Sequence, residues 1–240
     1  MGLITPRLLW DRALHPVVGF RSVAQADPPW GPALGRMLLL RVPVGLVAWG
    51  VGVLKLSLFT QGLRTLEGPM WSRALELIVR LNPEVRIQDL RSLAAELPSL
   101  PPTGTLLLWG LLAVPLGLLG AWLHNAAWDH GCLWLAGGLK RGRGIRRTLS
   151  AESEAMAVGV LGALASLLGD IPIAGLLLSL PLAVLALYFW ILRGISLAAF
   201  HEVEAWRGIL AVVLHLVLVA CCACGLLGFL AFALFVPLGA

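Results

Sequence analysis

Residues 208–240 read GILAVVLHLVLVACCACGLLGFLAFALFVPLGA and contain no Asp, Glu, Lys or Arg. Two further runs, 97–128 and 171–192, also lack these four residue types. Each run exceeds the roughly 18–20 apolar residues that a helix needs to cross the hydrocarbon layer of a bilayer. The three runs therefore predict a polytopic membrane protein with helical spans.

The composition of the whole chain points to the same class. Of the 240 residues, 59% are hydrophobic and 13% are charged, whereas soluble domains carry about 45–50% apolar and roughly 25% charged residues. The formal net charge is +5. Because the basic residues flank the apolar runs, they indicate anchoring at a membrane surface, and we expect no nucleic-acid partner.

The placement of the runs predicts an all-α integral membrane protein with five transmembrane helices. Residues 1–35 are expected to be an amphipathic segment at the membrane interface, because Arg, Trp and Phe alternate there with aliphatic residues. Residues 36–240 are expected to form the membrane domain. Its spans are predicted at about 38–59, 104–136, 154–168, 173–192 and 209–235.

The segment 60–103 differs from the spans on either side of it. It carries five arginines and five acidic residues, and apolar residues recur at helical spacing before and after Asn82-Pro83. This pattern predicts two short amphipathic helices that form a surface loop between the first and second spans. The pattern leaves open whether the loop packs into the helix bundle.

The basic residues predict the orientation of the chain. Counted over alternating loops, eleven lysines and arginines share the side of the N-terminus and five lie on the other side. Because cytoplasmic loops carry the excess of such residues, we expect the N-terminus in the cytoplasm and the C-terminus outside. Arginine outnumbers lysine sixteen to two, which fits a GC-rich bacterial genome and hence the bacterial inner membrane.

The most polar stretch inside a predicted span reads HNAAWDH, at residues 124–130. Asn125 and Asp129 are four residues apart and share a helix face, whereas His130 lies about 100° from Asp129. An ionisable residue at membrane depth is expensive unless it is paired, so it suggests a function. The candidates for an intramembrane proton or ion site are His124, Asn125, Asp129 and His130.

A second interpretation of Asp129 gives it a structural role. It lies about two helical turns before Gly137, and the basic turn KRGRGIRR follows at residues 140–147. At that distance the carboxylate would lie near the cytoplasmic interface and pair with Arg143 or Arg146. We favour this interpretation over a proton or ion site.

The basic turn and the predicted polar link 193–207 are expected on the same side of the membrane. Together they suggest a cytoplasmic docking surface, and the alternative is a solvated link without a partner. The candidate docking residues are Lys140, Arg141, Arg143, Arg146, Arg147, Arg193, His201, Glu202 and Arg207.

The sequence contains no enzyme signature, such as a nucleophile elbow, a zinc-protease helix or a phosphate-binding loop. The cysteines, at 132, 221, 222 and 224, lie inside apolar stretches without metal-ligand spacing. We therefore expect no catalytic residues, no cofactor and no bound metal.

The order of several features resembles one protein family. In chain order these features are Pro16, Phe20, Arg21 and Trp30 in the lead-in, His130 before Gly137-Gly138, the compact span pair around Asp170-Ile171-Pro172, and His201 six residues before Arg207. The pattern is similar to the Yip domain family (Ypt-interacting proteins), in particular its bacterial branch. The likeness covers about residues 14–235, with 60–103 as an insertion.

The resemblance implies a five-span protein with a cytoplasmic N-terminus and no established catalytic residues. Eukaryotic members of the family organise membranes and bind small GTPases and partner Yip proteins, but their long cytoplasmic N-terminal region has no counterpart here. We therefore expect a non-enzymatic membrane protein that contacts lipids and scaffolds a protein partner or a second copy of itself. The alternative is a small transporter or channel that uses Asp129 and His130.

Overall fold

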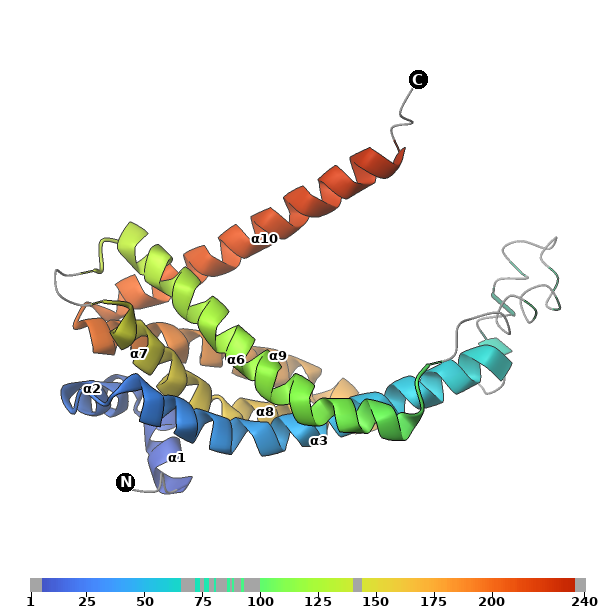
Figure 1. Ribbon diagram of the computed structural model, residues 1–240, viewed down its shortest axis with the longest axis horizontal. Coiled ribbons are helices and arrows are strands. Elements are labelled where there is room, and N and C mark those ends of the chain that lie inside the picture. The colour runs from blue at the N-terminus through green and yellow to red at the C-terminus, as the bar shows by residue number, and fades with distance from the viewer. Residues whose placement is uncertain are drawn as a thin grey trace. The chain divides into compact units, whose positions relative to one another are not determined.

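The computed structural model describes residues 6–65, 100–139 and 144–235, together with single positions between 72 and 92. Helices are the only regular structure in these residues, so the predicted all-α class is confirmed (Figure 1). Most of the predicted loop 60–103 lies outside the described residues. Its first residues continue the preceding helix as far as Thr65.

Eight helices are described, and four of them are long and apolar enough to cross a membrane, or five if one bent pair counts as a span. The helices are α1 (Pro6–Leu14), α2 (Pro16–Gln25), α3 (Trp30–Thr65), α6 (Thr103–Leu135), α7 (Ile145–Val158), α8 (Val160–Gly169), α9 (Pro172–His201) and α10 (Ala205–Phe235).

The helix boundaries differ from the predicted span boundaries at two places. The span expected at 154–168 is a pair of helices, α7 and α8, bent by 41° at Gly159. The expected polar link 193–207 is mostly helical, because α9 continues to His201 and α10 begins at Ala205. The helix continues through the polar residues of the segment because partners on other helices contact Arg193 and His201. Only the short turn at 202–204 separates them.

The described residues divide into two compact units. The first comprises Met1–Val44 and Leu116–Ala240, and the second comprises Gly45–Pro115. In the second unit, Trp49 Nε1 donates a hydrogen bond to the Leu106 carbonyl over 2.8 Å. The candidate site residues of the described chain all lie in the first unit.

The N-terminal helices α1 and α2 bury part of their apolar residues within the protein. Leu9, Ala13, Phe20 and Ala24 are buried, and α2 packs against α9 while α1 packs against α7. We predicted an amphipathic segment at the membrane interface. The structure forms it as two helices, which cover other helices with some of their apolar residues and leave others exposed, such as Val18 at 72%.

The turn between α9 and α10 brings two backbones close together. A Cβ atom on Gly194 would lie 2.6 Å from Ile209 Cα, and a Cβ on Gly208 would meet the Gly194 carbonyl. Glu202 ends α9 in the left-handed conformation, with φ 51°, and Val203 N donates to the Ala198 carbonyl over 3.0 Å. This backbone hydrogen bond satisfies one carbonyl of the last helical turn.

Helix α7 is polar and yet enclosed by other helices. Its buried residues include Thr148, Ser150, Glu152, Ser153 and Glu154. Buried carboxylates need partners, because an unpaired charge in the interior is strongly unfavourable. The partners of α7 define the candidate site.

Candidate functional site

The candidate site is built around two buried carboxylates of α7, Glu152 and Glu154. Residues two positions apart in a helix are separated by about 200° around its axis, so the two carboxylates point in nearly opposite directions. Glu152 is fully buried and Glu154 is 1% exposed. Each carboxylate gathers arginines from different helices.

On one side of α7, a single guanidinium contacts two carboxylates. Arg193 Nη2 of α9 lies 2.8 Å from Asp129 Oδ2 of α6. Its Nε atom lies 3.2 Å from Glu152 Oε1 and 3.0 Å from Oε2. The Arg193 side chain is 9% exposed and both carboxylates are fully buried. Helices α6, α7 and α9 are therefore joined by one cation.

His215 of α10 completes this cluster. Its Nδ1 atom lies 2.6 Å from Asp129 Oδ1 and 3.0 Å from Arg193 Nη2. A guanidinium only donates and an ionised carboxylate only accepts, so Nδ1 either donates to Asp129 or accepts from Arg193. The Trp128 ring stacks on the imidazole at 5.8 Å, and His124 Nε2 is 3.4 Å from His215 Nε2.

The other side of α7 binds the N-terminal region. The Glu154 carboxylate accepts hydrogen bonds from Arg12 of α1 and from Arg36 of α3. The Tyr188 hydroxyl of α9 donates to the Ala13 carbonyl and adds a second attachment for α1. These contacts fix the amphipathic lead-in to the core of the first unit.

A third polar chain runs through Thr148 of α7. The Thr148 hydroxyl lies 2.8 Å from His130 Nδ1 and 2.9 Å from His201 Nε2. One residue earlier, Arg147 donates to the Phe200 carbonyl over 3.0 Å. It also lies 3.5 Å from Asp27 and 3.7 Å from Glu202. These contacts hold the turns after α2 and α9 against α7.

The ionic groups lie in a layer near one end of the helices. Asp129, Glu152, Arg193 and His215 are six to ten residues from a helix end, or roughly 9–15 Å. Beyond that layer, 172–192 of α9 and 216–235 of α10 contain no charged residue. Each of these lengths spans roughly 30 Å, the thickness of the hydrocarbon layer. The layer therefore lies at the border of the apolar part of the bundle.

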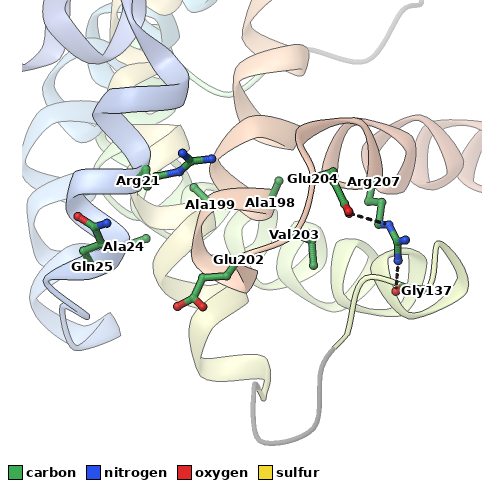
Figure 2. Close-up of a pocket in the computed structure, with 10 residues that line it drawn as sticks. All are labelled: Arg21, Ala24, Gln25, Gly137, Ala198, Ala199, Glu202, Val203, Glu204 and Arg207. Carbon is green, nitrogen blue, oxygen red and sulfur yellow. Dashed lines mark hydrogen bonds and ion pairs between the residues drawn. The ribbon is translucent and has the colours of Figure 1, made fainter.

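A pocket of about 730 Å³ opens beside this layer, between α2 and the turn from α9 to α10 (Figure 2). Arg21 and Gln25 of α2 are exposed at one side. Glu202 and Glu204 lie at the other side, with side chains 59% and 63% exposed. Arg207 Nη1 donates a hydrogen bond to the Gly137 carbonyl over 2.6 Å, and Arg207 Nε lies 2.9 Å from Glu204 Oε2. The pocket thus presents charges of both signs.

The structure brings only part of the predicted polar site together. Asp129 and His124 both contact His215, whereas His130 belongs to the separate Thr148 chain. The side chain of Asn125 makes no hydrogen bond within the described part of the chain. We predicted that Asp129 pairs with Arg143 or Arg146. Among the described residues its arginine partner is Arg193 and not Arg146, so this part of the prediction is wrong. Arg143 lies outside the described residues.

The predicted docking surface also requires correction. Arg193 and His201 are 8% and 0% exposed, because the extended helix α9 turns them into the interior, so they are not surface residues. Arg146 and Glu202 are exposed, and Arg147 and Arg207 are partly exposed. Lys140, Arg141 and Arg143 lie outside the described residues.

The sequence interpretation missed Glu152 and His215 as site residues. His215 stands alone inside a charge-free run, and Glu152 precedes an apolar span by few residues. Either residue is a signal of an internal partner, since such groups are rare in spans. Their pairing with Arg193 depends on helix packing, which sequence spacing does not reveal.

Within the described chain, no group of three or more His, Cys, Asp or Glu side chains has the arrangement of a metal site. Asp129 and His215 form a hydrogen-bonded network with Arg193, and His124 joins it through His215. No protein-family model, curated protein or solved structure matches this chain.

Proposed function

We propose that this chain is a non-enzymatic, multi-pass membrane protein that scaffolds a protein partner through the pocket beside Arg21 and Glu204. The observation that carries the proposal is the pocket itself. Its rim comes from α2 and from the turn between α9 and α10, and Arg147 and Arg207 hold these segments in place. A preformed rim lowers the ordering cost of binding.

The partner that fits this pocket is a protein segment with both acidic and basic side chains. Arg21 offers an exposed cation, and Glu202 and Glu204 offer exposed carboxylates on the opposite side. Complementary charges at a rim favour the correct partner and its orientation. The resemblance to the Yip domain family supports a scaffolding role of this kind.

The proposal places the pocket on the cytoplasmic face of a bacterial inner membrane. The pocket lies at the end of the helices that carries Gly137 and Glu202. The excess of eleven basic residues over five on that side supports this orientation. The N-terminus would then be cytoplasmic and the C-terminus external.

The test is site-specific photo-crosslinking in cells. A photoreactive amino acid at Gln25 lies in the pocket without disturbing an ion pair of the described residues. We expect one discrete protein adduct from this position. The matched control places the same group at Leu187, which is 65% exposed on the apolar part of α9. A protein adduct of equal yield from Leu187, or none from Gln25, would contradict the proposal.

A second candidate function, proton-coupled transport, is favoured by the cluster around Arg193. Two carboxylates share one guanidinium, so one proton on His215 or on a carboxyl group would balance the charge. Reconstitution into liposomes with an internal pH dye tests this function. Proton flux that depends on Asp129 would support transport, and the scaffold proposal expects flux equal to that of empty liposomes.

A further inference from the structure

The side chain of Arg41, on α3, contacts the bend between α7 and α8. Its Nη1 atom donates to the Gly159 carbonyl over 2.8 Å, and the same carbonyl accepts from Ala163 N over 3.1 Å. A guanidinium has five N–H donors. In the part of the chain that the structure describes, this bond is the only one that the Arg41 side chain makes.

The charges of the layer around α7 do not balance. Three carboxylates form ion pairs with three arginines, which leaves Arg41 without a carboxylate within 4.0 Å among the described residues. The carboxylates are Asp129, Glu152 and Glu154, and their partners are Arg12, Arg36 and Arg193. A cation inside an apolar span without a counter-charge is costly. A bound anion would remove this cost.

A groove of about 390 Å³ extends from Arg41 along the junction of α8 and α9. At its polar end Trp190 is 37% exposed, and the Arg193 guanidinium lies 5.4 Å from the Trp190 ring centroid. Towards the other end its lining includes Ala163, Leu182 and Leu185. Exposed tryptophans are enriched at the level of lipid headgroups, so the polar end matches the membrane interface.

The direction of the groove fits a molecule with a charged head and an apolar tail. Arg41 lies five residues further along α3 than Arg36, which corresponds to roughly 7–8 Å. The groove therefore begins just inside the ionic layer and continues into the charge-free part of α9. A small inorganic anion would fill only the polar end.

We propose that this groove binds an anionic phospholipid, with its phosphate on the guanidinium of Arg41 and an acyl chain along Ala163, Leu182 and Leu185. Arginine N–H groups match the geometry of phosphate oxygens. A zwitterionic lipid carries its own cation beside the phosphate and leaves the charge of Arg41 unbalanced. The site is therefore selective for lipids with a net negative charge.

The experiment measures lipid binding to the full-length protein in detergent by native mass spectrometry. Phosphatidylglycerol and phosphatidylcholine with identical acyl chains compete for the protein. The wild type is expected to prefer phosphatidylglycerol, and Arg41→Gln is expected to lower that preference about tenfold, because a charge-assisted bond is lost. The matched control is Lys55→Gln, which removes one exposed cation of the same helix and should retain the preference.

A second variant tests the apolar part of the groove. Ala163→Phe fills the groove beside α8 and should reduce the binding of both lipids, while Arg41 keeps its charge. Unchanged preference in Arg41→Gln, or an equal loss in Lys55→Gln, would overturn the proposal. So would wild-type lipid binding by Ala163→Phe, or protection against thermal unfolding by inorganic phosphate equal to that by phosphatidylglycerol.

Discussion

Arg193 contacts both Asp129 and Glu152 in the interior of the first unit. Replacing it by methionine would leave two buried carboxylates without their cation, and we expect a loss of about 3–5 kcal/mol in the free energy of unfolding. Asp129→Asn leaves one cation facing one carboxylate, so we expect a loss of only about 1 kcal/mol. Chemical denaturation in detergent measures both variants. Equal losses would contradict this account of the cluster.

Gly208 permits the close approach of α9 and α10. A Cβ atom at this position would lie 2.9 Å from Ala198 N and would meet the Gly194 carbonyl. Gly208→Ala should therefore lower the free energy of unfolding by about 1–3 kcal/mol. Gly225→Ala on the same helix is the control, since no atom lies within 4 Å of its Cβ position. Thermal unfolding should show the control unchanged or slightly stabilised.

At the scale of elements, α1 depends on Glu154 of α7. Glu154→Gln weakens the hydrogen bonds from both Arg12 and Arg36. We expect backbone hydrogen exchange over Pro6–Leu14 to accelerate roughly ten- to hundredfold, because each is a charge-assisted bond. Asp11→Asn removes an exposed carboxylate of α1 and should leave exchange unchanged. Exchange at the wild-type rate in Glu154→Gln would show that α1 is held without the bonds to Glu154.

The elements themselves were predictable where hydrophobic runs are long. The spans expected at 104–136 and 173–192 lie almost entirely within α6 and α9. The ends were less predictable, because Arg193 and His201 look polar in sequence and their burial depends on partners from other helices, among them Asp129, Glu152 and Thr148. The candidate polar site was also predictable only in part. The sequence identified Asp129, but its partners lie on other helices and could not be assigned from spacing.

At the scale of the whole molecule, the proposed orientation of the chain rests on its basic residues. A reporter that is active only outside the cytoplasm should be active when fused after Ala240 and silent when inserted at Gly144. The excess of lysines and arginines beside Gly144 is the physical reason. The reverse pattern of activity would invert the proposed topology and place the pocket outside the cytoplasm.

The scaffold proposal assigns partner binding to the pocket and not to the buried cluster around Arg193. The measurement that tests it most directly compares one variant in the pocket with one in the cluster. The yield of the Gln25 photo-adduct, normalised to folded protein in the membrane, is measured in Arg21→Glu and in Asp129→Asn. Arg21 is an exposed residue of the pocket and Asp129 is fully buried. The account expects Arg21→Glu to lose most of the adduct and Asp129→Asn to retain it. Loss of the adduct in folded Asp129→Asn, with the wild-type yield in Arg21→Glu, would contradict the account.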